Sequence, residues 1–364
     1  MVAARLVLPA CLLLAQSATA TVHCVATPEE MTAALAAAAQ NTSGSDEIRL
    51  RTGTYAAPDG GWRVDVQLRG IDIEGGYTDA GCQVRTLDAA QTVLDGRGAV
   101  RPLTIDTSFS PQTATGITVR ALTFANGAGD RAGGLKVSDG GPIYSGRMLI
   151  EGNIFRDNVA SVYEEDNSGG GLLAATDGNS GGGTVFLTVR DNLFVGNRAN
   201  DAAAAMLFSN DGIAVTNNTV TGNQPFDTTL ATRTSFAIFT FSPLTYRNNV
   251  FWANNPDNLA GTFDLHGDNR FSVNLAATLI ANDLQAVVGT PGTQLGNLSV
   301  DPNFIDAVGG DFRLAGDSLL LDAGADAPHD GLGATDVAGL PRVAGAHVDI
   351  GAFESDRIFG DGFE

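Results

Sequence analysis

The sequence is poor in basic residues, and this scarcity removes several classes of function. It contains a single lysine, Lys136, and only 21 Lys and Arg against 41 Asp and Glu, which gives a formal net charge of −20. There is no basic block, so binding to a nucleic-acid backbone or to an anionic lipid surface is not expected. Aromatic residues are also scarce, at 7%. Apolar residues make up 43% of the 364 positions, enough for the core of one large domain or two ordinary ones.

Long apolar runs are missing except at the N-terminus, so no transmembrane span is expected in the mature chain. Residues 1–20 have the features of a secretory signal peptide: Arg5 supplies a positive charge, residues 6–14 are apolar, and residues 18–20 read Ala-Thr-Ala, a typical cleavage site. The sequence therefore predicts an exported protein, located extracellularly or on the outer cell surface.

Cysteines number only three, and cleavage after Ala20 would remove Cys11. In an exported chain the remaining Cys24 and Cys82 are expected to form a disulfide. Such a bond would close a loop of about 58 residues and contribute about 4 kcal/mol in the chain-entropy model. No C-x-x-C pair is present, so a zinc site or thioredoxin-like chemistry has no support.

One pattern recurs along the chain. An apolar-x-apolar stretch is followed by an Asn, then by an aromatic residue or Val, and a second Asn stands three residues after that aromatic residue or Val. Full copies lie at residues 148–158, 187–197, 213–223 and 244–254, and a degenerate copy at 117–124. A second short strand is expected before each full copy, at 134–137, 171–174, 205–208 and 237–239. Short strands, Gly-rich corners and a variable period predict a solenoid of parallel strands.

Stacking of these copies predicts rows of equivalent side chains. The inward row is Phe124, Phe155, Phe194, Val220 and Phe251. Two rows of asparagine are expected at the bends, where their amides can satisfy free backbone groups and bond to one another: Asn153, Asn192, Asn218, Asn249, and Asn158, Asn197, Asn223, Asn254. A fourth row, expected to be an exposed ionic ladder, is Arg120, Glu151, Arg190, Thr216 and Arg247.

The segment before the repeats contains one clear helix signal. Thr27 is a suitable N-cap, Pro28 suits the first helical position, and Glu30 completes a capping box ahead of the Ala-rich residues 31–40. A solenoid needs its open end covered, so this helix is expected to be the N-terminal cap, held to the first coils by the expected disulfide.

With these repeats, the sequence resembles the right-handed parallel β-helix proteins of the pectin-lyase-like superfamily. Gly-Gly-Leu at 133–135 and 170–172, followed by Phe-x-x-Asn, is also similar to the repeats of polymorphic outer-membrane adhesins. The resemblance implies an all-β fold, a right-handed parallel β-helix solenoid with an N-terminal capping helix, over residues 21–300.

A second resemblance covers residues 301–354. This stretch includes Leu-Asp-Ala-Gly at 321–324, Gly-Leu-Pro-Arg at 339–342 and Val-Asp-Ile-Gly-Ala-Phe-Glu at 348–354. It is similar to the choice-of-anchor module, Q type, found at the end of many exported bacterial β-helix proteins, and is expected to be a C-terminal capping module. Residues 355–364 form a short tail whose role the sequence leaves open.

The catalytic signatures of the superfamily are missing. The sequence has no Asp-Asp pair, no Gly-His-Gly and no Arg-x-Pro-x-x-Arg, so the usual hydrolase and lyase routes lack support. Two sets of candidates remain. For a glycan groove, on or beside insertions at one corner of the expected solenoid, they are Lys136, Arg131, Glu164, Glu165 and Asp166. For calcium, the one cofactor considered, they are Asp264, Asp268 and Asn269, with a surface turn as the simpler interpretation.

The sequence therefore predicts an exported, adhesin-like or glycan-binding protein without catalysis. A polysaccharide lyase or glycoside hydrolase working in a loop-lined groove is one alternative. A structural envelope or matrix protein is another. The expected partner is a polysaccharide or a cell-surface glycan.

Overall fold

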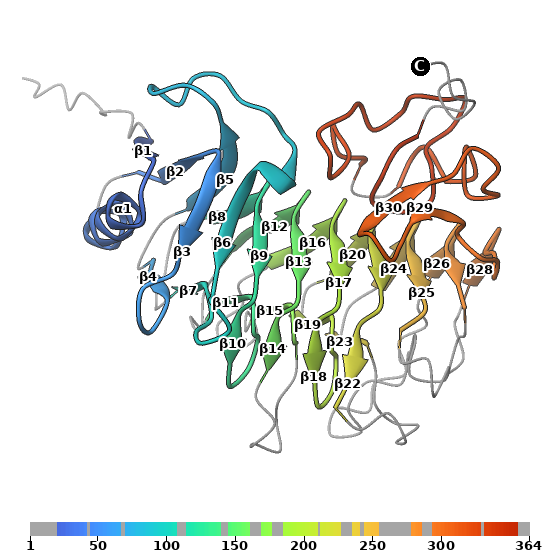
Figure 1. Ribbon diagram of the computed structural model, residues 1–364, viewed down its shortest axis with the longest axis horizontal. Coiled ribbons are helices and arrows are strands. Elements are labelled where there is room, and N and C mark those ends of the chain that lie inside the picture. Colours follow the sequence, from blue (N-terminus) through green and yellow to red (C-terminus); the bar gives the residue numbers. More distant parts are fainter. Residues whose placement is uncertain are drawn as a thin grey trace, which may run out of the picture.

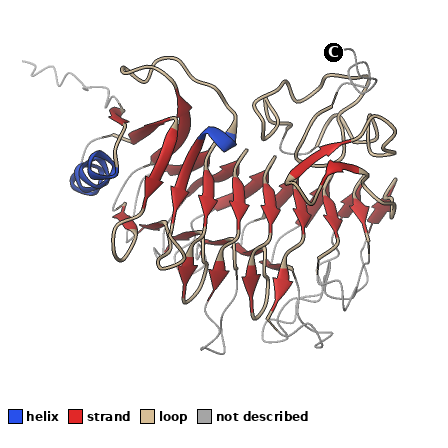
Figure 2. Ribbon diagram, in the orientation of Figure 1, coloured by secondary structure: helices blue, strands red, loops and turns tan. Residues whose placement is uncertain are grey.

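The computed structural model describes residues 20–41, 44–66, 70–107, 114–139, 145–160, 169–176, 185–209, 212–226, 235–240, 244–254, 278–285, 293–328 and 331–355. In this part of the chain the fold is predominantly β, with parallel sheets and a single α-helix (Figures 1 and 2). No helix among the described residues is long and apolar enough to cross a membrane. The expected signal peptide lies almost wholly outside the described residues, as do all but the first residue of the tail.

Four parallel sheets contain nearly all the strands. Sheet A is formed by β1 (Thr21–Val25), β2 (Asp46–Arg51), β5 (Ile71–Tyr77), β8 (Ala114–Arg120), β12 (Ser145–Glu151), β16 (Val185–Arg190), β20 (Ile213–Thr216), β24 (Leu244–Arg247), β26 (Thr278–Ile280) and β28 (Thr293–Leu295). Sheet B is formed by β3 (Gly53–Ala56), β6 (Thr92–Asp95), β9 (Thr123–Ala125), β13 (Ile154–Arg156), β17 (Leu193–Val195), β21 (Thr219–Thr221), β25 (Val250–Trp252) and β27 (Asp283–Leu284). Sheet C is formed by β4 (Trp62–Asp65), β7 (Leu103–Thr107), β11 (Leu135–Asp139), β15 (Leu172–Thr176), β19 (Ala205–Ser209) and β23 (Phe236–Thr240). Sheet D is formed by β10 (Ala128–Gly129), β14 (Val159–Ala160), β18 (Arg198–Ala199) and β22 (Gln224–Pro225).

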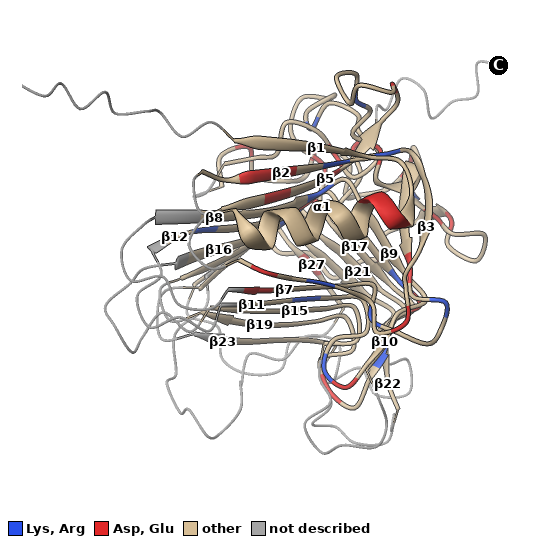
Figure 3. Cartoon of the chain, turned by 90° about the vertical axis from the view of Figure 1, so that its left-hand side faces the viewer, with Lys and Arg blue, Asp and Glu red and all other residues tan. Residues whose placement is uncertain are grey.

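The chain visits the sheets in a fixed order. From β8 to β23 it passes repeatedly through sheets A, B, D and C, and each circuit adds one parallel strand to each sheet. Seen from its N-terminal end, the molecule has sheet A above and sheet C below, with the core between them (Figure 3). The short strands expected before each full repeat copy are present as parts of β11, β15, β19 and β23.

The expected row of inward rings is confirmed. The centroids of Phe124 and Phe155 lie 5.1 Å apart, and those of Phe155 and Phe194 lie 4.8 Å apart, with nearly parallel planes. These separations match the spacing of adjacent strands, because one ring comes from each circuit. Where the row has the smaller Val220, Phe236 of sheet C contributes a ring that packs edge-on against both Phe194 and Phe251.

Both asparagine rows are confirmed, and each sits at a corner with a special backbone. In the row that begins at Asn153, the side-chain amides of successive circuits are joined by hydrogen bonds of 2.9–3.1 Å. This row continues beyond the repeats through Asn282 to Asn297. The residue just before each buried row member has a positive φ, which small or Asx residues tolerate best. At this corner these residues are Gly152, Asp191, Asn217, Asn248 and Ala281. The row that begins at Asn158 follows the same scheme.

The ionic row on the outer face of sheet A is also present, and it is longer and more buried than expected. Strand register extends it to Arg49 and Glu74, so that charges alternate from Arg49 to Arg190. Arg190 Nη2 lies 2.6 Å from Glu151 Oε1, and both side chains are only about one-seventh exposed. The ladder is therefore partly buried rather than fully exposed as expected, although the Arg120 side chain is still 39% exposed. Arg190 Nη1 also donates to the carbonyl of Gly331 at 3.4 Å.

The N-terminal cap forms as the sequence predicts. Helix α1 (Pro28–Gln40) begins after Thr27, whose hydroxyl accepts from Glu30 N, while the Glu30 carboxylate accepts from Ala26 N. The helix lies across the end of the molecule (Figure 3) and buries Met31 and Leu35 among other residues. The disulfide between Cys24 and Cys82 is present, with a Cα–Cα distance of 5.7 Å, and ties β1 to the loop after β5.

Residues 301–355 contain one antiparallel hairpin, β29 (Phe304–Asp306) with β30 (Asp311–Leu314), followed by an irregular segment. We call residues 320–328 and 331–354 the strap. It packs along the outer face of sheet B rather than forming another circuit (Figure 1). Ile350 and Leu320 pack with Val250, while Val337 and Ala352 pack with Ala89 of the short 3-10 helix η1 (Ala89–Gln91).

Candidate ligand-binding face

The outer face of sheet C is the face to which Lys136 belongs. Residues in its strands alternate between inward apolar side chains and outward ones, as period-two strands require. The strand register places one outward residue of each strand in a row, and the row reads Arg63, Thr104, Lys136, Leu173, Met206 and Ala237. A second outward row reads Asp65, Asp106, Ser138, Ala175 and Phe208.

The end of this face nearest α1 is polar and tightly paired. Arg63 Nη2 lies 2.6 Å from Asp106 Oδ2, and Arg101 donates to the Thr104 hydroxyl at 3.2 Å. Arg101 also pairs with Asp130, at 2.7 Å. These contacts fix the orientation of the polar groups before any ligand arrives, which lowers the entropic cost of binding.

Lys136 stands in the middle of the row with different surroundings. It is half-buried, it lies between Thr104 and Leu173 in register, and it forms no ion pair or hydrogen bond with another described residue. A half-buried ammonium with no acceptor among the described residues is suited to an acceptor that a ligand supplies. Beyond Lys136 the face becomes apolar, with half-buried Met206 and Phe208.

The other sequence candidates divide into two groups. Arg131 is exposed in the turn before β11, where its N–H donates to Asp130 Oδ1 at 2.9 Å and its carbonyl accepts from Arg101 at 2.5 Å. The structure therefore brings Arg131 to the corner beside sheet C. The remaining candidates lie outside the described residues: Glu164, Glu165, Asp166, Asp264, Asp268 and Asn269.

Sequence reasoning missed the polar partners at the start of this face. Arg63, Thr104 and Asp106 belong to circuits that lack the Asn repeat, so no motif marks them. A weaker signal was available, because Trp-Arg-Val-Asp at 62–65 and Leu-Thr-Ile-Asp at 103–106 both alternate apolar and polar residues.

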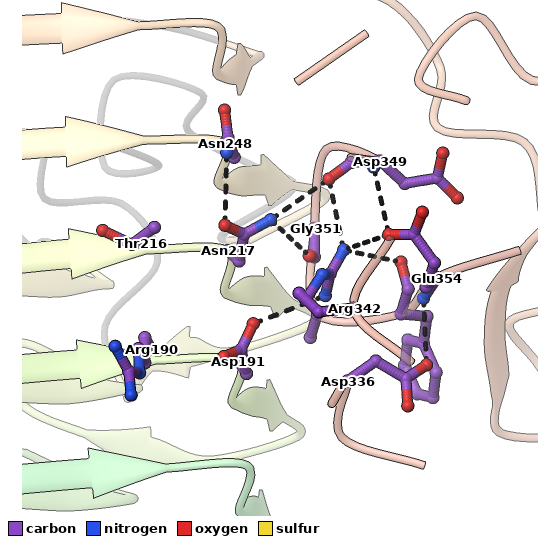
Figure 4. A network of polar contacts seen from close by, with 12 residues as sticks. Arg190, Asp191, Thr216, Asn217, Asn248, Asp336, Arg342, Asp349, Gly351 and Glu354 are labelled. Atoms are coloured by element: carbon purple, nitrogen blue, oxygen red, sulfur yellow. Dashed lines mark hydrogen bonds and ion pairs between the residues drawn. The ribbon is translucent and has the colours of Figure 1, made fainter. Parts of the chain in front are cut away.

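A second polar cluster lies between the strap and the corner that carries the longer Asn row (Figure 4). Arg342 is 2% exposed and extends from the strap toward Asp191, at 3.4 Å, and Glu354, at 2.9 Å. Asn217 Nδ2 donates to the carbonyl of Asp349 at 3.1 Å, and Ala325 N donates to Asn248 Oδ1 at 2.7 Å. The corner residues with positive φ are thus the ones that hold the strap.

The carboxyl groups in this cluster have pKa values above their ordinary range. Complete burial raises the pKa of Asp191 to about 7, although Arg342 opposes the shift. Burial likewise raises the pKa of Glu354 to about 7, and raises the pKa values of Asp336 and Asp349. All four side chains are buried with Arg342, so no substrate can reach them, and we assign the cluster to structure rather than to catalysis.

Among the residues that the structure describes, no group of three or more His, Cys, Asp or Glu side chains is arranged to hold a metal ion. No family model, no curated protein and no solved structure matches this chain. Function must therefore be inferred from the site itself rather than from relatives.

Proposed function

We propose that this protein is an exported right-handed parallel β-helix that binds glycans on the outer face of sheet C without cleaving them. The observation that carries the proposal is the row of polar side chains on that face, in which Lys136 has no ion-pair or hydrogen-bond partner among the described residues and the positions beyond it are apolar. Sugar rings combine hydroxyl and carboxylate acceptors with apolar C–H faces, so they suit a surface where polar groups adjoin Met and Phe.

The β-helix assignment rests on the fixed circuit of the chain and on a general rule. Crossovers between parallel strands of one sheet are nearly always right-handed, because a twisted strand returns onto its sheet in only that way. Export is supported by the signal-like residues 1–20 and by the disulfide, since disulfides persist mainly in oxidising compartments.

The test is binding of the full mature protein to an array of acidic and neutral glycans, with and without calcium, followed by titration of the best ligand. Lys136→Gln removes the charged donor and keeps much of the side-chain length. We expect its affinity to fall by at least about tenfold, because a hydrogen bond to a charged group contributes about 1.5–3 kcal/mol.

The matched control is Arg156→Gln, which removes an exposed cation from sheet B, and it should leave affinity unchanged. Equal affinity of the Lys136→Gln variant and the wild type, or no binding to any glycan, would refute the proposal. Release of new reducing ends or of unsaturated uronate from the bound glycan would instead establish the enzyme alternative.

A further inference from the structure

The strap runs lengthwise along the molecule and contacts circuits that do not touch one another. Its residue Ala325 bonds to Asn248, Gly333 lies against Asp191, and Val337 accepts from Ala89 N at 3.1 Å. The chain then returns, since Ala352 N donates to the Thr219 hydroxyl at 2.9 Å and Gly351 N donates to the carbonyl of Asn248 at 2.8 Å. The described strands of each circuit pair with those of the neighbouring circuits, whereas this segment links early and late circuits.

The contact between strap and corner is rich in acid and short of base. Asp191 approaches from the corner, Asp336, Asp349 and Glu354 belong to the strap, and the only cation among them is Arg342. The nearby Glu151 and Arg190 neutralise each other, and Asp322 adds another acid at the edge. Asp191 Oδ2 and Arg342 Nε are buried without a hydrogen-bond partner. Of these four buried acids, only Asp191 and Glu354 contact the guanidinium. The carboxylates of Asp336 and Asp349 accept from backbone N–H groups instead.

We infer that the strap is a proton-coupled latch, because its docking on the corner that carries the longer Asn row takes up protons. Acidification therefore favours the docked strap, and neutral to alkaline pH favours its release. A loosened strap would bare the apolar side chains that it covers on sheet B, such as Ile154 and Val250. The inference concerns a different face from the proposed glycan site and stands independently of it.

The sign of the effect follows from the direction of the shifts. Asp191 and Glu354 have pKa values of about 7 when docked, against ordinary values of 3.8 and 4.5. A carboxyl whose pKa is raised by docking contributes its full stabilisation below its ordinary pKa, and this contribution is lost as pH rises through the docked value. The change is therefore confined to about pH 4–7, and the docking constant falls roughly tenfold per pH unit for each proton taken up.

The experiment is hydrogen exchange of the full mature protein from pH 5 to 8, corrected for the pH dependence of intrinsic exchange. The reporters are the docked amides of Ala325, Gly351 and Ala352, and the internal reference is the sheet A amides of β12 and β16. We expect protection of the strap amides to fall about tenfold or more per unit between pH 5 and 7, while the reference changes much less. Strap protection that is constant, or that rises with pH, would overturn the inference.

Substitutions show which carboxyl groups take up the protons when the strap docks. Asp191→Asn suits the corner, where Asn217 and Asn248 already occupy equivalent positive-φ positions, and it should reduce the slope. Glu354→Gln tests the second acid and serves if Asp191→Asn does not fold. The matched control is Asp157→Asn, at the equivalent position of the other corner, where the carboxyl is 58% exposed and only 3.6 Å from Arg156. The control should keep the wild-type slope; an unaltered slope in both test variants, or a reduced one in the control, would contradict a latch at Arg342.

Discussion

Asn192 occupies the middle of the longer asparagine row and is fully buried. Its amide oxygen accepts from the backbone and side-chain N–H groups of Asn153, and its nitrogen donates to Asn218 Oδ1 and to the carbonyl of Ile150. The side chain thus satisfies, on each circuit, backbone groups that the corner withdraws from the sheets. An amide suits this role because it both donates and accepts along one line.

Asn192→Ala should therefore be strongly destabilising. The substitution removes the acceptor of two buried N–H groups of Asn153 and the side-chain donor to Ile150 O, while Asn218 Oδ1 keeps only its bond from the Asn192 backbone. At about 1–3 kcal/mol for each group left unpaired, we expect a loss of about 3 kcal/mol or more in the free energy of unfolding. Urea titration followed by circular dichroism measures it. The control is Asn126→Ala, at the other corner, where the amide is half-buried and bonds to Asp95 at 3.1 Å and where Ala253 already has an equivalent positive φ. Losses of equal size in the two variants would refute a special role for the row.

At the scale of elements, the first strands and the capping helix form a unit that one covalent bond secures. Among the strands that the structure describes, β1 pairs with β2 alone, and α1 contacts β1, β2 and β4. The disulfide between Cys24 and Cys82 joins this edge to the loop after β5, and Arg49 donates to the carbonyl of Cys82 at 2.9 Å.

Replacing both cysteines by serine should loosen this end first. We expect a loss of about 2–5 kcal/mol in stability, as is typical for removal of a native disulfide, and faster hydrogen exchange in β1 and α1 than in β16 or β20. Reduction of the wild-type protein should give the same pattern. Uniform acceleration along the whole chain would show that the bond does not act locally.

Local pattern predicted some elements and not others, for physical reasons. The Phe and Asn rows were predictable because each circuit repeats the same contact, so the periodicity records the packing. The capping helix was predictable because Thr27, Pro28 and Glu30 act within one turn. The path of the strap was not predictable, since Arg342 and Asp191 lie 151 residues apart and nothing in either segment specifies the other. On the candidate face, the sequence identified Lys136 as unusual but not its paired neighbours Arg63 and Asp106, which lie in circuits without the repeat.

At the scale of the whole molecule, the strap decides how cooperatively the circuits unfold. In a stack where each circuit contacts only its neighbours, the circuits at the two ends can unfold independently of each other. The strap connects the circuit of η1 with that of β25 through Val337 and Ile350, so an early and a late circuit should unfold together.

The chain's two tryptophans allow a direct test, because Trp62 lies in β4 near the N-terminal end and Trp252 lies in β25 beside the strap. In single-tryptophan proteins made by Trp62→Phe or Trp252→Phe, the urea transitions should coincide. Gly333→Ala should separate them, because a Cβ there would lie 2.1 Å from Asp191 Oδ2 and push the strap off its corner. We expect the Trp252 midpoint to fall by about 0.5 M or more, given a loss of about 1–2 kcal/mol and the usual slopes in urea. Gly116→Ala, whose added Cβ meets only Arg147 O at 3.9 Å, should leave the two curves together. If the curves stay together in Gly333→Ala as well, cooperativity must come from contacts between neighbouring circuits alone.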